Sequence, residues 1–288
     1  MALTAALELG GTKTLVAVGS DPLDLAPVRL ETSGPERTLG QVLDYLSDRR
    51  FDSLGVAAFG PLGLSPGRPG YGQLMRAPKP GWSGFDLLGW LAERLDVPLS
   101  LDTDVNAAAL GEWRWGAAIH ADQAAYVTIG TGIGAGLVVR GSLLHGEPHP
   151  EVGHIVVRAL EGDGFAGVCP YHGGCLEGMA SGPALRARFG ASPEDLSGGT
   201  LESAVDIASA YLAQGLTNII YTWAPDRIVV GGGVSKMPGF HDAVRREVIT
   251  RTAGYPRDLG TVISGLIVPP ALGERSALAG AFALASLR

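Results

Sequence analysis

Residues 9–13 read LGGTK and join two apolar stretches, 5–9 and 14–18, that we expect to form strands. A similar pattern recurs in the second half of the chain, where residues 130–134 read GTGIG between the apolar stretches 126–129 and 135–139. Glycine in such turns lets backbone N–H groups come close to phosphate oxygens. Two strand-turn-strand units with glycine tips predict an internal duplication and two candidate phosphate-binding turns.

These turns do not fit two common nucleotide-binding motifs. A P-loop requires the pattern G-x-x-x-x-G-K-[S/T] between a strand and a helix, and residues 10–13 lack that spacing. A dinucleotide-binding fingerprint requires glycines that open a helix, whereas residues 135–139 read as a strand. The pattern favours phosphates held at the tips of paired strands, although a single glycine turn can equally be only a turn.

The composition is typical of a globular protein. Hydrophobic residues make up 46% of the 288 residues and charged residues 18%, which is enough to build a full core. The net charge of −7 argues against a nucleic-acid partner, because such proteins usually present a basic face. We see no secretory signal pattern and no apolar stretch of membrane length, so we expect a cytoplasmic protein without a membrane partner.

Strands alternate with helical patterns along the rest of the chain, which predicts an α/β protein. The expected strands are residues 51–59, 99–102 and 227–230, and the expected helices are 39–49, 85–95, 106–115, 201–222 and 276–287. The second glycine turn opens a new half, so we predict two similar α/β domains, residues 1–117 and 118–288. The last helix could pack back on the first domain.

A third glycine stretch follows the strand expected at 227–230, where residues 229–234 read VVGGGV. With the turns at 9–13 and 130–134, in the same order, the chain resembles the ROK family (repressor, open reading frame, kinase), and within it the bacterial fructokinases. The resemblance implies the actin-like ATPase (ribonuclease H-like) fold, with two similar α/β domains and a cleft between them. It also implies a set of residues that bind ATP: Gly10, Gly11, Thr12, Lys13, Gly130, Thr131, Gly132, Gly182, Gly231, Gly232 and Gly233.

Glu8 precedes the first glycine turn and stands where many ROK kinases carry aspartate. The resemblance implies that this carboxylate helps to hold the Mg²⁺ of Mg-ATP. Glutamate keeps the negative charge and adds a methylene, so we expect magnesium binding with an altered geometry.

A carboxylate follows the strand expected at 99–102. Residues 101–109 read LDTDVNAAA, which places Thr103 and Asp104 between this strand and a helix. Asp and Thr at a helix start are commonly N-caps, but phosphoryl transfer to a hydroxyl also needs a group that accepts its proton. The resemblance implies that Asp104 is this base and that Asp102 is structural. Thr103 stands where many relatives carry a sugar-contacting asparagine, which favours a sugar other than glucose.

Four residues of the types that bind zinc are gathered between positions 154 and 175. Cys169, His172 and Cys175 follow a C-x2-H-x2-C spacing, and His154 could be a fourth ligand. Such a set suits tetrahedral zinc, although a free cysteine pair with incidental histidines has the same spacing. The resemblance favours zinc, and a His-Cys-His-Cys set resembles the fructokinase branch. With four protein ligands the zinc would be structural.

The same part of the chain holds polar residues suited to a sugar. A carboxylate can accept hydrogen bonds from two hydroxyls at once. The resemblance implies a substrate-binding set that consists of Gly60, Thr103, Asp104, Glu151, His154 and Glu177.

The remaining features have plainer interpretations. Residues 76–82 read RAPKPGW, which without a family match would be a proline-stiffened surface loop. The segment also resembles the fructokinase branch, so we expect it to border the sugar site. His120, His145 and His241 are expected to be surface or packing residues.

Taken together, the resemblance implies an ATP-dependent kinase that transfers the γ-phosphoryl group to the 6-hydroxyl of a hexose, with fructose as first choice. Mannose, glucose or another hexose stay open, because few hydroxyls distinguish these sugars. The alternatives are a non-catalytic sugar-binding regulator and a hydrolase or acetate-type kinase on the same fold. ROK repressors carry a helix-turn-helix ahead of the first turn, which we do not expect here. A homodimer, with ATP and the hexose as small-molecule partners, is also implied.

Overall fold

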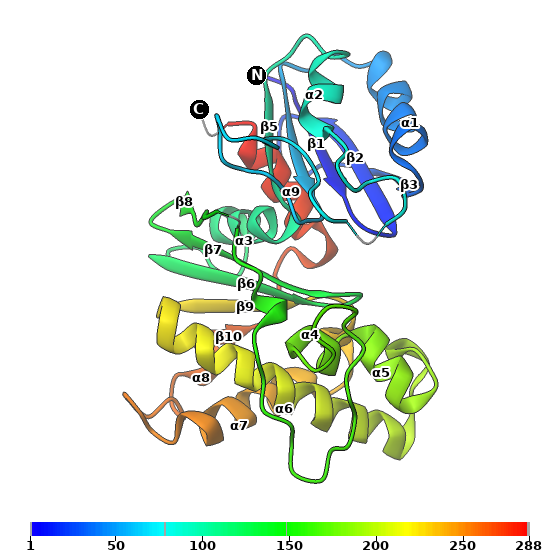
Figure 1. Ribbon diagram of the computed structural model, residues 1–288. Helices are drawn as coiled ribbons and strands as arrows, with labels where there is room; N and C mark the ends of the chain where they lie inside the picture. Colours follow the sequence, from blue (N-terminus) through cyan, green and yellow to red (C-terminus); the bar gives the residue numbers. More distant parts are fainter. Residues whose placement is uncertain (1, 78, 148, 287–288) are drawn as a thin grey trace. The chain divides into compact units, whose positions relative to one another are not determined.

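The computed structural model describes residues 2–77, 79–147 and 149–286 (Figure 1). Its contacts divide the chain into two compact units. The N-terminal unit contains the chain up to Ile119, the segment Gly136–Pro150 and the chain from Glu274; the C-terminal unit contains His120–Ala135 and Glu151–Gly273. The two units are defined by contacts alone. The predicted division into two domains, 1–117 and 118–288, stays a prediction.

A five-stranded sheet of order β3-β2-β1-β4-β5 is the centre of the N-terminal unit. Its strand β1 pairs antiparallel with β2 and parallel with β4, and β4 pairs parallel with β5. The carboxyl ends of three parallel strands therefore meet at one edge of the sheet. The five strands are β1 (Thr4–Leu9), β2 (Lys13–Gly19), β3 (Val28–Glu31), β4 (Ser53–Ala58) and β5 (Leu99–Thr103).

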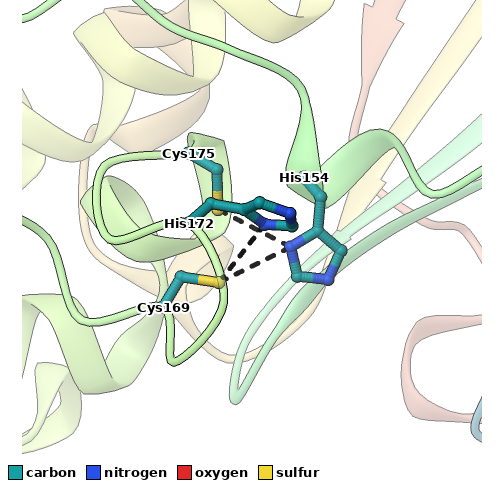
Figure 2. Close-up of side chains that lie close together, drawn as sticks. All are labelled: His154, Cys169, His172 and Cys175. Atoms are coloured by element: carbon teal, nitrogen blue, oxygen red, sulfur yellow. Dashed lines mark hydrogen bonds between the residues drawn. The ribbon is translucent and has the colours of Figure 1, made fainter. Parts of the chain in front are cut away.

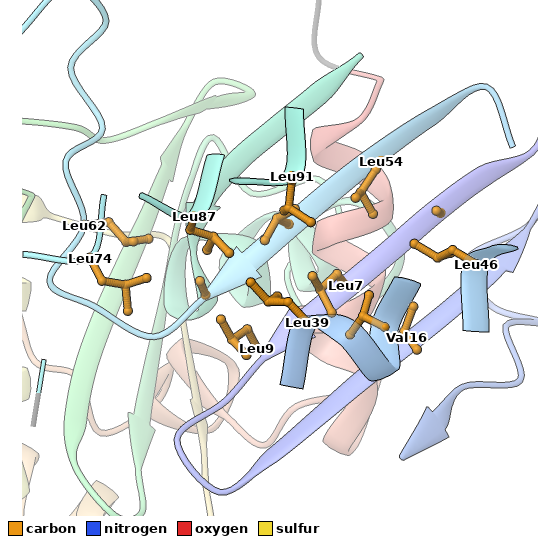
Figure 3. Close-up of a cluster of buried hydrophobic side chains, with 14 of the residues drawn as sticks. Leu7, Leu9, Val16, Leu39, Leu46, Leu54, Leu62, Leu74, Leu87 and Leu91 are labelled. Atoms are coloured by element: carbon orange, nitrogen blue, oxygen red, sulfur yellow. The ribbon is translucent and has the colours of Figure 1, made fainter. Parts of the chain in front are cut away.

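The main core of this unit lies between the sheet and the helices α1 (Pro35–Ser47) and α2 (Leu87–Ala92). Leu7 and Leu9 of β1 project from the same face, because strand side chains alternate, and they join leucines of both helices in one buried cluster (Figure 3). Burial of each such side chain contributes about 1.5–3 kcal/mol.

The opposite face of the sheet is covered by α9 (Ser276–Leu284), which packs on β1, β4 and α3 (Asp104–Trp115). Glycine makes this close approach possible. A Cβ atom on Gly280 of α9 would lie 1.7 Å from the carbonyl oxygen of Ala107 in α3. The last helix thus belongs to the N-terminal unit.

The second sheet has the order β10-β9-β6-β7-β8. It repeats the plan of the first: two strands joined by a glycine turn, with two parallel strands beside the first of them. The segment Gly136–Pro150, which contains the second half of β7 and all of β8, is counted with the N-terminal unit. The strands are β6 (Gln123–Ile129), β7 (Ile133–Val139), β8 (Ser142–Leu143), β9 (Arg227–Gly231) and β10 (Ile267–Val268).

Helices of the C-terminal unit pack around the long helix α6 (Gly198–Trp223), which contacts three of the others. The others are α4 (Leu176–Ala180), α5 (Gly182–Phe189), α7 (Phe240–Thr252) and α8 (Ile263–Leu266). Within the described part of the chain, no helix has both the length and the apolar character needed to span a membrane.

Most expected elements are present, with shifted ends. Helix α1 begins four residues before the expected position 39, because Pro35 suits the first helical turn, where no backbone N–H is needed. Helix α9 ends at Leu284 rather than at 287, and Leu287 itself lies outside the described residues. The elements that were not predicted are the strands β3, β8 and β10 and the helices α4, α5, α7 and α8.

Candidate functional site

Three carboxylates lie at the carboxyl ends of parallel strands in the N-terminal unit. Glu8 is the next-to-last residue of β1, Asp102 is the next-to-last residue of β5, and Asp104 is the first residue of α3. The register of β1, β4 and β5 places Glu8 and Asp102 on either side of Ala57. Because ligands of α/β sheets bind at such strand ends, this edge is the candidate site of the N-terminal unit.

Glu8 is held in an environment that suits a cation. Burial raises the pKa of Glu8 to about 7; Lys13 opposes this rise, and Asp104 and Glu274 add to it. The Oε2 atom of Glu8 is buried and has no hydrogen-bond partner among the residues that the structure describes. Such an atom is unfavourable unless a ligand satisfies it. Since Mg²⁺ prefers carboxylate oxygens, Glu8 fits the role that the resemblance implies.

The first glycine turn, residues 10–12, is braced by the strand next to it. The amide of Gly10 donates to the carbonyl oxygen of Lys13 at 3.0 Å, and the hydroxyl of Thr32 donates to the carbonyl oxygen of Gly10 at 2.8 Å. The ammonium of Lys13 forms a 3.2 Å ion pair with Glu274. Gly11 and Thr12 are exposed, so their backbone is accessible to a phosphate.

Asp104 is not the N-cap of its helix. That position belongs to Thr103, whose hydroxyl accepts a hydrogen bond from the amide of Asn106 at 3.1 Å. Burial raises the pKa of Asp104 to about 6, although its carboxylate accepts a 2.8 Å hydrogen bond from the amide of Val105. A carboxylate that takes up a proton close to neutral pH is suited to general-base work. The buried Thr103 hydroxyl, by contrast, is already engaged in capping.

Asp102 makes contacts that the sequence did not reveal. Its Oδ1 accepts hydrogen bonds from the amide of Thr103 at 2.7 Å and from the side chain of Asn106 at 2.9 Å. Its Oδ2 accepts a 2.6 Å hydrogen bond from Nε2 of His145. This bond is the main reason that the pKa of His145 is raised. His145, expected to be a surface or packing residue, is therefore bound to this edge. We call Glu8, Lys13, Asp102, Asp104, His145 and Glu274 the strand-end cluster.

The predicted sugar contact Gly60 follows β4 at the same edge. A Cβ atom at this position would lie 3.2 Å from the ring of His149, and Nε2 of His149 accepts a hydrogen bond from the amide of Leu62 at 3.1 Å. Glycine at position 60 thus leaves room for the ring of His149, on which the charges of Asp102 and His145 both act.

The predicted metal ligands come together in the C-terminal unit (Figure 2). The ligand atoms of His154, Cys169, His172 and Cys175 all lie within 4.8 Å of one another. Nδ1 of His154 is 3.7 Å from the sulfur of Cys169 and 3.6 Å from that of Cys175. Sulfur and nitrogen ligands on a tetrahedral zinc ion are about 3.5 Å apart, so the cluster has the dimensions of such a site.

Both cysteines are buried and free of disulfides. Burial raises the pKa of the Cys175 thiol to about 11, so a metal ion must displace a proton to bind there. Zinc binding by such thiols releases protons and depends on pH. Two sulfurs with two imidazoles match zinc better than magnesium or calcium, which prefer oxygen ligands.

The loop around this cluster also supports the second glycine turn, residues 130–132. The carboxylate of Glu177 accepts a hydrogen bond from the amide of Ile133 at 3.0 Å. The amide of Gly182, at the start of α5, donates to the carbonyl oxygen of Gly130 at 2.7 Å. Thr131, Cys169 and Glu177 line one small cavity of about 160 Å³. The predicted metal loop and the predicted phosphate turn are thus neighbours.

Two other predicted sugar ligands, Glu151 and His154, lie on one turn, and His154 also belongs to the metal cluster. Glu151 precedes the short turn η1 (Val152–His154), and its carbonyl oxygen accepts a hydrogen bond from the amide of His154 at 3.0 Å. Nδ1 of His154 faces the two sulfurs. A metal would therefore use Nδ1 and leave Nε2 for another partner.

The third glycine stretch ends β9 and lies against the second turn. A Cβ atom on Gly231 would lie 2.2 Å from the hydroxyl of Tyr126, and one on Gly232 would lie 2.4 Å from the carbonyl oxygen of Ile129. A Cβ atom on Gly130 would lie 3.5 Å from the amide nitrogen of Gly233. Glycine is therefore needed at 231 and 232, and the nucleotide residues predicted in this unit are brought together.

The segment 76–82 is anchored by its tryptophan rather than lying free on the surface. Trp82 is fully buried, and its indole N–H donates to the carbonyl oxygen of Ser33 at 2.7 Å. Its ring packs edge-on against Phe59. Pro78 lies outside the described residues. That this segment borders a sugar site stays a prediction.

A profile of the ROK family matches residues 4–288. The chain belongs to the ROK family. The fructokinase of Zymomonas mobilis is 40% identical to this ROK protein over 287 residues, which cover 97% of this chain and 95% of the relative. The fructokinase of Pediococcus pentosaceus is 37% identical over 285 residues, covering 98% and 97% of the two chains.

Solved structures show the same fold. The ROK hexokinase of Thermus thermophilus superposes with a TM-score of 0.79 and 28% identity, over 99% of this chain and 98% of the other. The protein thus has the actin-like ATPase fold, as the motifs predicted. The repeated strand order of its two sheets accounts for the two similar glycine turns.

Sequence reasoning missed two residues of the strand-end cluster. His145 follows β8 and Glu274 precedes α9, so both are far in sequence from the residues they contact. A histidine beside glycines, such as His145, is too common a local pattern to be informative. His145 and Glu274 are identified only by their contacts in space with Asp102 and Lys13.

Proposed function

We propose that this ROK protein is an ATP-dependent fructokinase that transfers the γ-phosphoryl group of ATP to the 6-hydroxyl of fructose. The observation that carries the proposal is the nearly full-length identity of 36–40% with proteins named fructokinase. The retained carboxylate and glycine turns support catalysis rather than a purely regulatory role.

Asp104 is the proposed catalytic base. It would accept the proton of the sugar hydroxyl as that oxygen attacks the γ-phosphorus and the bond to the leaving ADP oxygen breaks. Its raised pKa, about 6, lets it remain mostly ionised at neutral pH while binding a proton readily. The base lies partly exposed at the strand ends of the N-terminal unit, where a bound sugar would limit competition from water.

The phosphates are proposed to be bound by backbone amides of the two glycine turns and by Lys13. Amides of Gly11 and Thr12 are accessible in the first turn, and preorganised donors stabilise negative charge that develops during transfer. Mg²⁺, when bound, would neutralise phosphate charge, and Glu8 is the residue proposed to hold it. The adenosine contacts proposed for the C-terminal unit are Gly182, Gly231, Gly232 and Gly233.

The sugar contacts proposed from the resemblance are Gly60, Thr103, Asp104, Glu151, His154 and Glu177. Two of them have a second task in this structure. Thr103 caps α3, and Glu177 supports the second glycine turn. A structural zinc ion is proposed for the four-ligand cluster, where it would fix the loop that carries His154 and Glu177. A homodimer and a cytoplasmic location are also proposed from the resemblance.

The decisive experiment is a coupled assay of ADP release with purified protein, Mg-ATP and separate hexoses: fructose, mannose, glucose, N-acetylglucosamine and N-acetylmannosamine. Reactions without sugar measure ATP hydrolysis, and NMR of the product identifies the phosphorylated hydroxyl. We expect turnover on fructose to exceed that on each other sugar and the product to be the 6-phosphate.

Preference for another hexose would reject the fructose assignment and retain the kinase. Absence of sugar-dependent turnover, with folded and metal-loaded protein, would reject the kinase proposal and favour a sugar-binding regulator. A 1-phosphate product would reject the role of the 6-hydroxyl.

A further inference from the structure

The strand-end cluster contains a histidine with a buried carboxylate behind it. The side chain of Asp102 is only 3% exposed, whereas that of His145 is 45% exposed. Their 2.6 Å hydrogen bond joins Oδ2 of Asp102 to Nε2 of His145. Because a carboxylate only accepts, Nε2 carries the proton, and the bond fixes both the ring orientation and the tautomer. The second nitrogen, Nδ1, has no partner within the described part of the chain and is left for a ligand.

The carboxylate is itself held rigidly. Oδ1 of Asp102 accepts from the amide of Thr103 and from the side-chain amide of Asn106. These donors belong to the junction of β5 and α3, the same junction that carries Asp104. His145 is therefore oriented by the element that presents the proposed catalytic base.

The position of His145 places it among proposed sugar contacts of the N-terminal unit. The charges of both Asp102 and His145 act on His149, and His149 packs against Gly60. The pair of Asp102 and His145 thus lies where the adjacent strands β4 and β5 end. Thr103 also lies at this edge, but its hydroxyl is buried and caps α3. His145, by contrast, is hydrogen-bonded to Asp102 and reaches solvent.

We propose that His145, oriented by Asp102, is a specificity-determining residue that hydrogen-bonds through Nδ1 to a non-reacting hydroxyl of the hexose. This inference rests on the proposed function as a hexose kinase. A hydroxyl is both donor and acceptor, so it can pair with Nδ1 whether or not the imidazole is protonated. A site built to bind a substrate hydroxyl discriminates strongly against analogues that lack it.

A purely structural role explains less of the geometry. The segment that carries His145 is already attached by main-chain bonds: the amide of Leu144 donates to the carbonyl oxygen of Leu137 at 2.8 Å. Asn106 adds a 3.4 Å contact to the carbonyl oxygen of Leu144. A half-exposed ring adds little burial to this attachment. Its fixed orientation is better explained by a ligand contact.

Two variants separate the two ring nitrogens. In His145→Gln, the side-chain amide can still donate to Asp102, as Nε2 does, but no atom replaces Nδ1. In His145→Asn, an amide atom can take the place of Nδ1, while the contact with Asp102 is lost. Each is assayed for kcat and KM with fructose and with ATP, alongside its melting temperature. The substrates include fructose analogues that each lack one hydroxyl other than the acceptor.

We expect His145→Gln to raise the KM for fructose about 10- to 100-fold, the effect of losing one hydrogen bond in a desolvated site. The KM for ATP and the melting temperature should not change. On one deoxy analogue the wild type and His145→Gln should have nearly the same KM, because that analogue already lacks the hydroxyl that Nδ1 would bind. His145→Asn should retain more of the fructose affinity than His145→Gln.

An unchanged KM for fructose in His145→Gln overturns the proposal, as does an equal loss on every analogue. If the wild-type protein phosphorylates no hexose, the proposed function fails separately. Calorimetry with the same hexoses then decides the role of His145: weaker binding by His145→Gln, selective for one hydroxyl, supports it, and absence of hexose binding overturns it.

Discussion

The strand-end cluster of the N-terminal unit and the four-ligand cluster of the C-terminal unit hold polar side chains in two different ways. Asp102 and Asp104 are fixed by a strand, a helix and its cap. His154 and Cys169 lie on a long segment that runs from β8 to α4 and has one short helical turn, η1, among its described residues. Regular elements satisfy their own backbone hydrogen bonds, whereas such a segment needs cross-links.

Two cross-links serve the segment between β8 and α4. One is the cluster of sulfur and imidazole ligands. The other is Asp163, whose carboxylate forms two hydrogen bonds with Arg188 of α5 and accepts one from the hydroxyl of Tyr211 in α6. The comparison therefore predicts that chemistry is most sensitive in the N-terminal cluster, and stability in the C-terminal segment.

The largest effect is expected from Asp104→Asn. Loss of the base should lower kcat by about 10²- to 10⁴-fold, with little change in melting temperature, because Thr103 still caps α3. Steady-state kinetics and a melting curve test both parts, with Asp96→Asn, an exposed carboxylate before the start of β5, as control. Turnover close to that of the wild type would mean that Asp104 is not the base.

Asp163→Asn should have the second largest effect. It leaves the largely buried Arg188 without its partner, which should reduce the free energy of unfolding by roughly 3 kcal/mol. Denaturant unfolding measures this, and Glu161→Gln, exposed on the same segment, should be neutral. Equal stability of the two variants would remove Asp163 as a cross-link.

The same carboxylate gives a pH dependence of stability. Hydrogen bonds from Arg188, the main cause, hold the pKa of Asp163 well below its usual range. The folded-state pKa is lower than that of the unfolded chain, so this stabilisation is present above about pH 4 and is lost as the pH falls further.

Metal removal should destabilise the protein by as much as Asp163→Asn does, or by less. At free zinc about 100 times its Kd, binding stabilises by about 2.7 kcal/mol. Removal should then lower the melting temperature by about 5–10 °C. Elemental analysis and thermal melts of the wild type, Cys169→Ser and the loop control Tyr171→Phe test this. Zinc content near zero in the wild type and no response to added zinc would count against the site.

The smallest expected effect is the response of turnover to pH. Burial raises the pKa of Asp104 to about 6, and a base works only when ionised. The kcat/KM for the sugar should fall about tenfold for each pH unit below 6. Profiles at two magnesium concentrations separate this from titration of Glu8, and the residual activity of Asp104→Asn should lack the fall. A profile flat to pH 5 would contradict the prediction.

Much of the fold could be predicted because its signals are local. Apolar stretches around glycine turns predicted β1, β2, β6 and β7, and the family motifs predicted the arrangement of two similar sheets. Helix α5 also had a local signal that was overlooked: Ser181 caps it and Pro183 lies in its first turn. Strand β3 had none, because its four residues are mostly exposed and pair only along one edge.

The metal cluster could be predicted for three of its ligands from spacing alone, because Cys169, His172 and Cys175 lie on one short loop. His154 was only a possible fourth ligand at that point, because it lies 15 residues before Cys169 and its approach depends on how η1 folds back. Thr103 shows the reverse case, in which a residue expected to contact the sugar also caps a helix.

The sequence by itself determined the α/β class, the glycine turns, the carboxylate at the head of α3 and the membership of a kinase family, because residue order and short spacings carry that information. Tertiary structure alone decided the partners of Asp102 and Lys13. His145 and Glu274 reach them only when β8 and the start of α9 are brought to the first sheet. Hydrogen bonds and charge pairs act over a few ångströms in space, and separation along the chain does not reveal them.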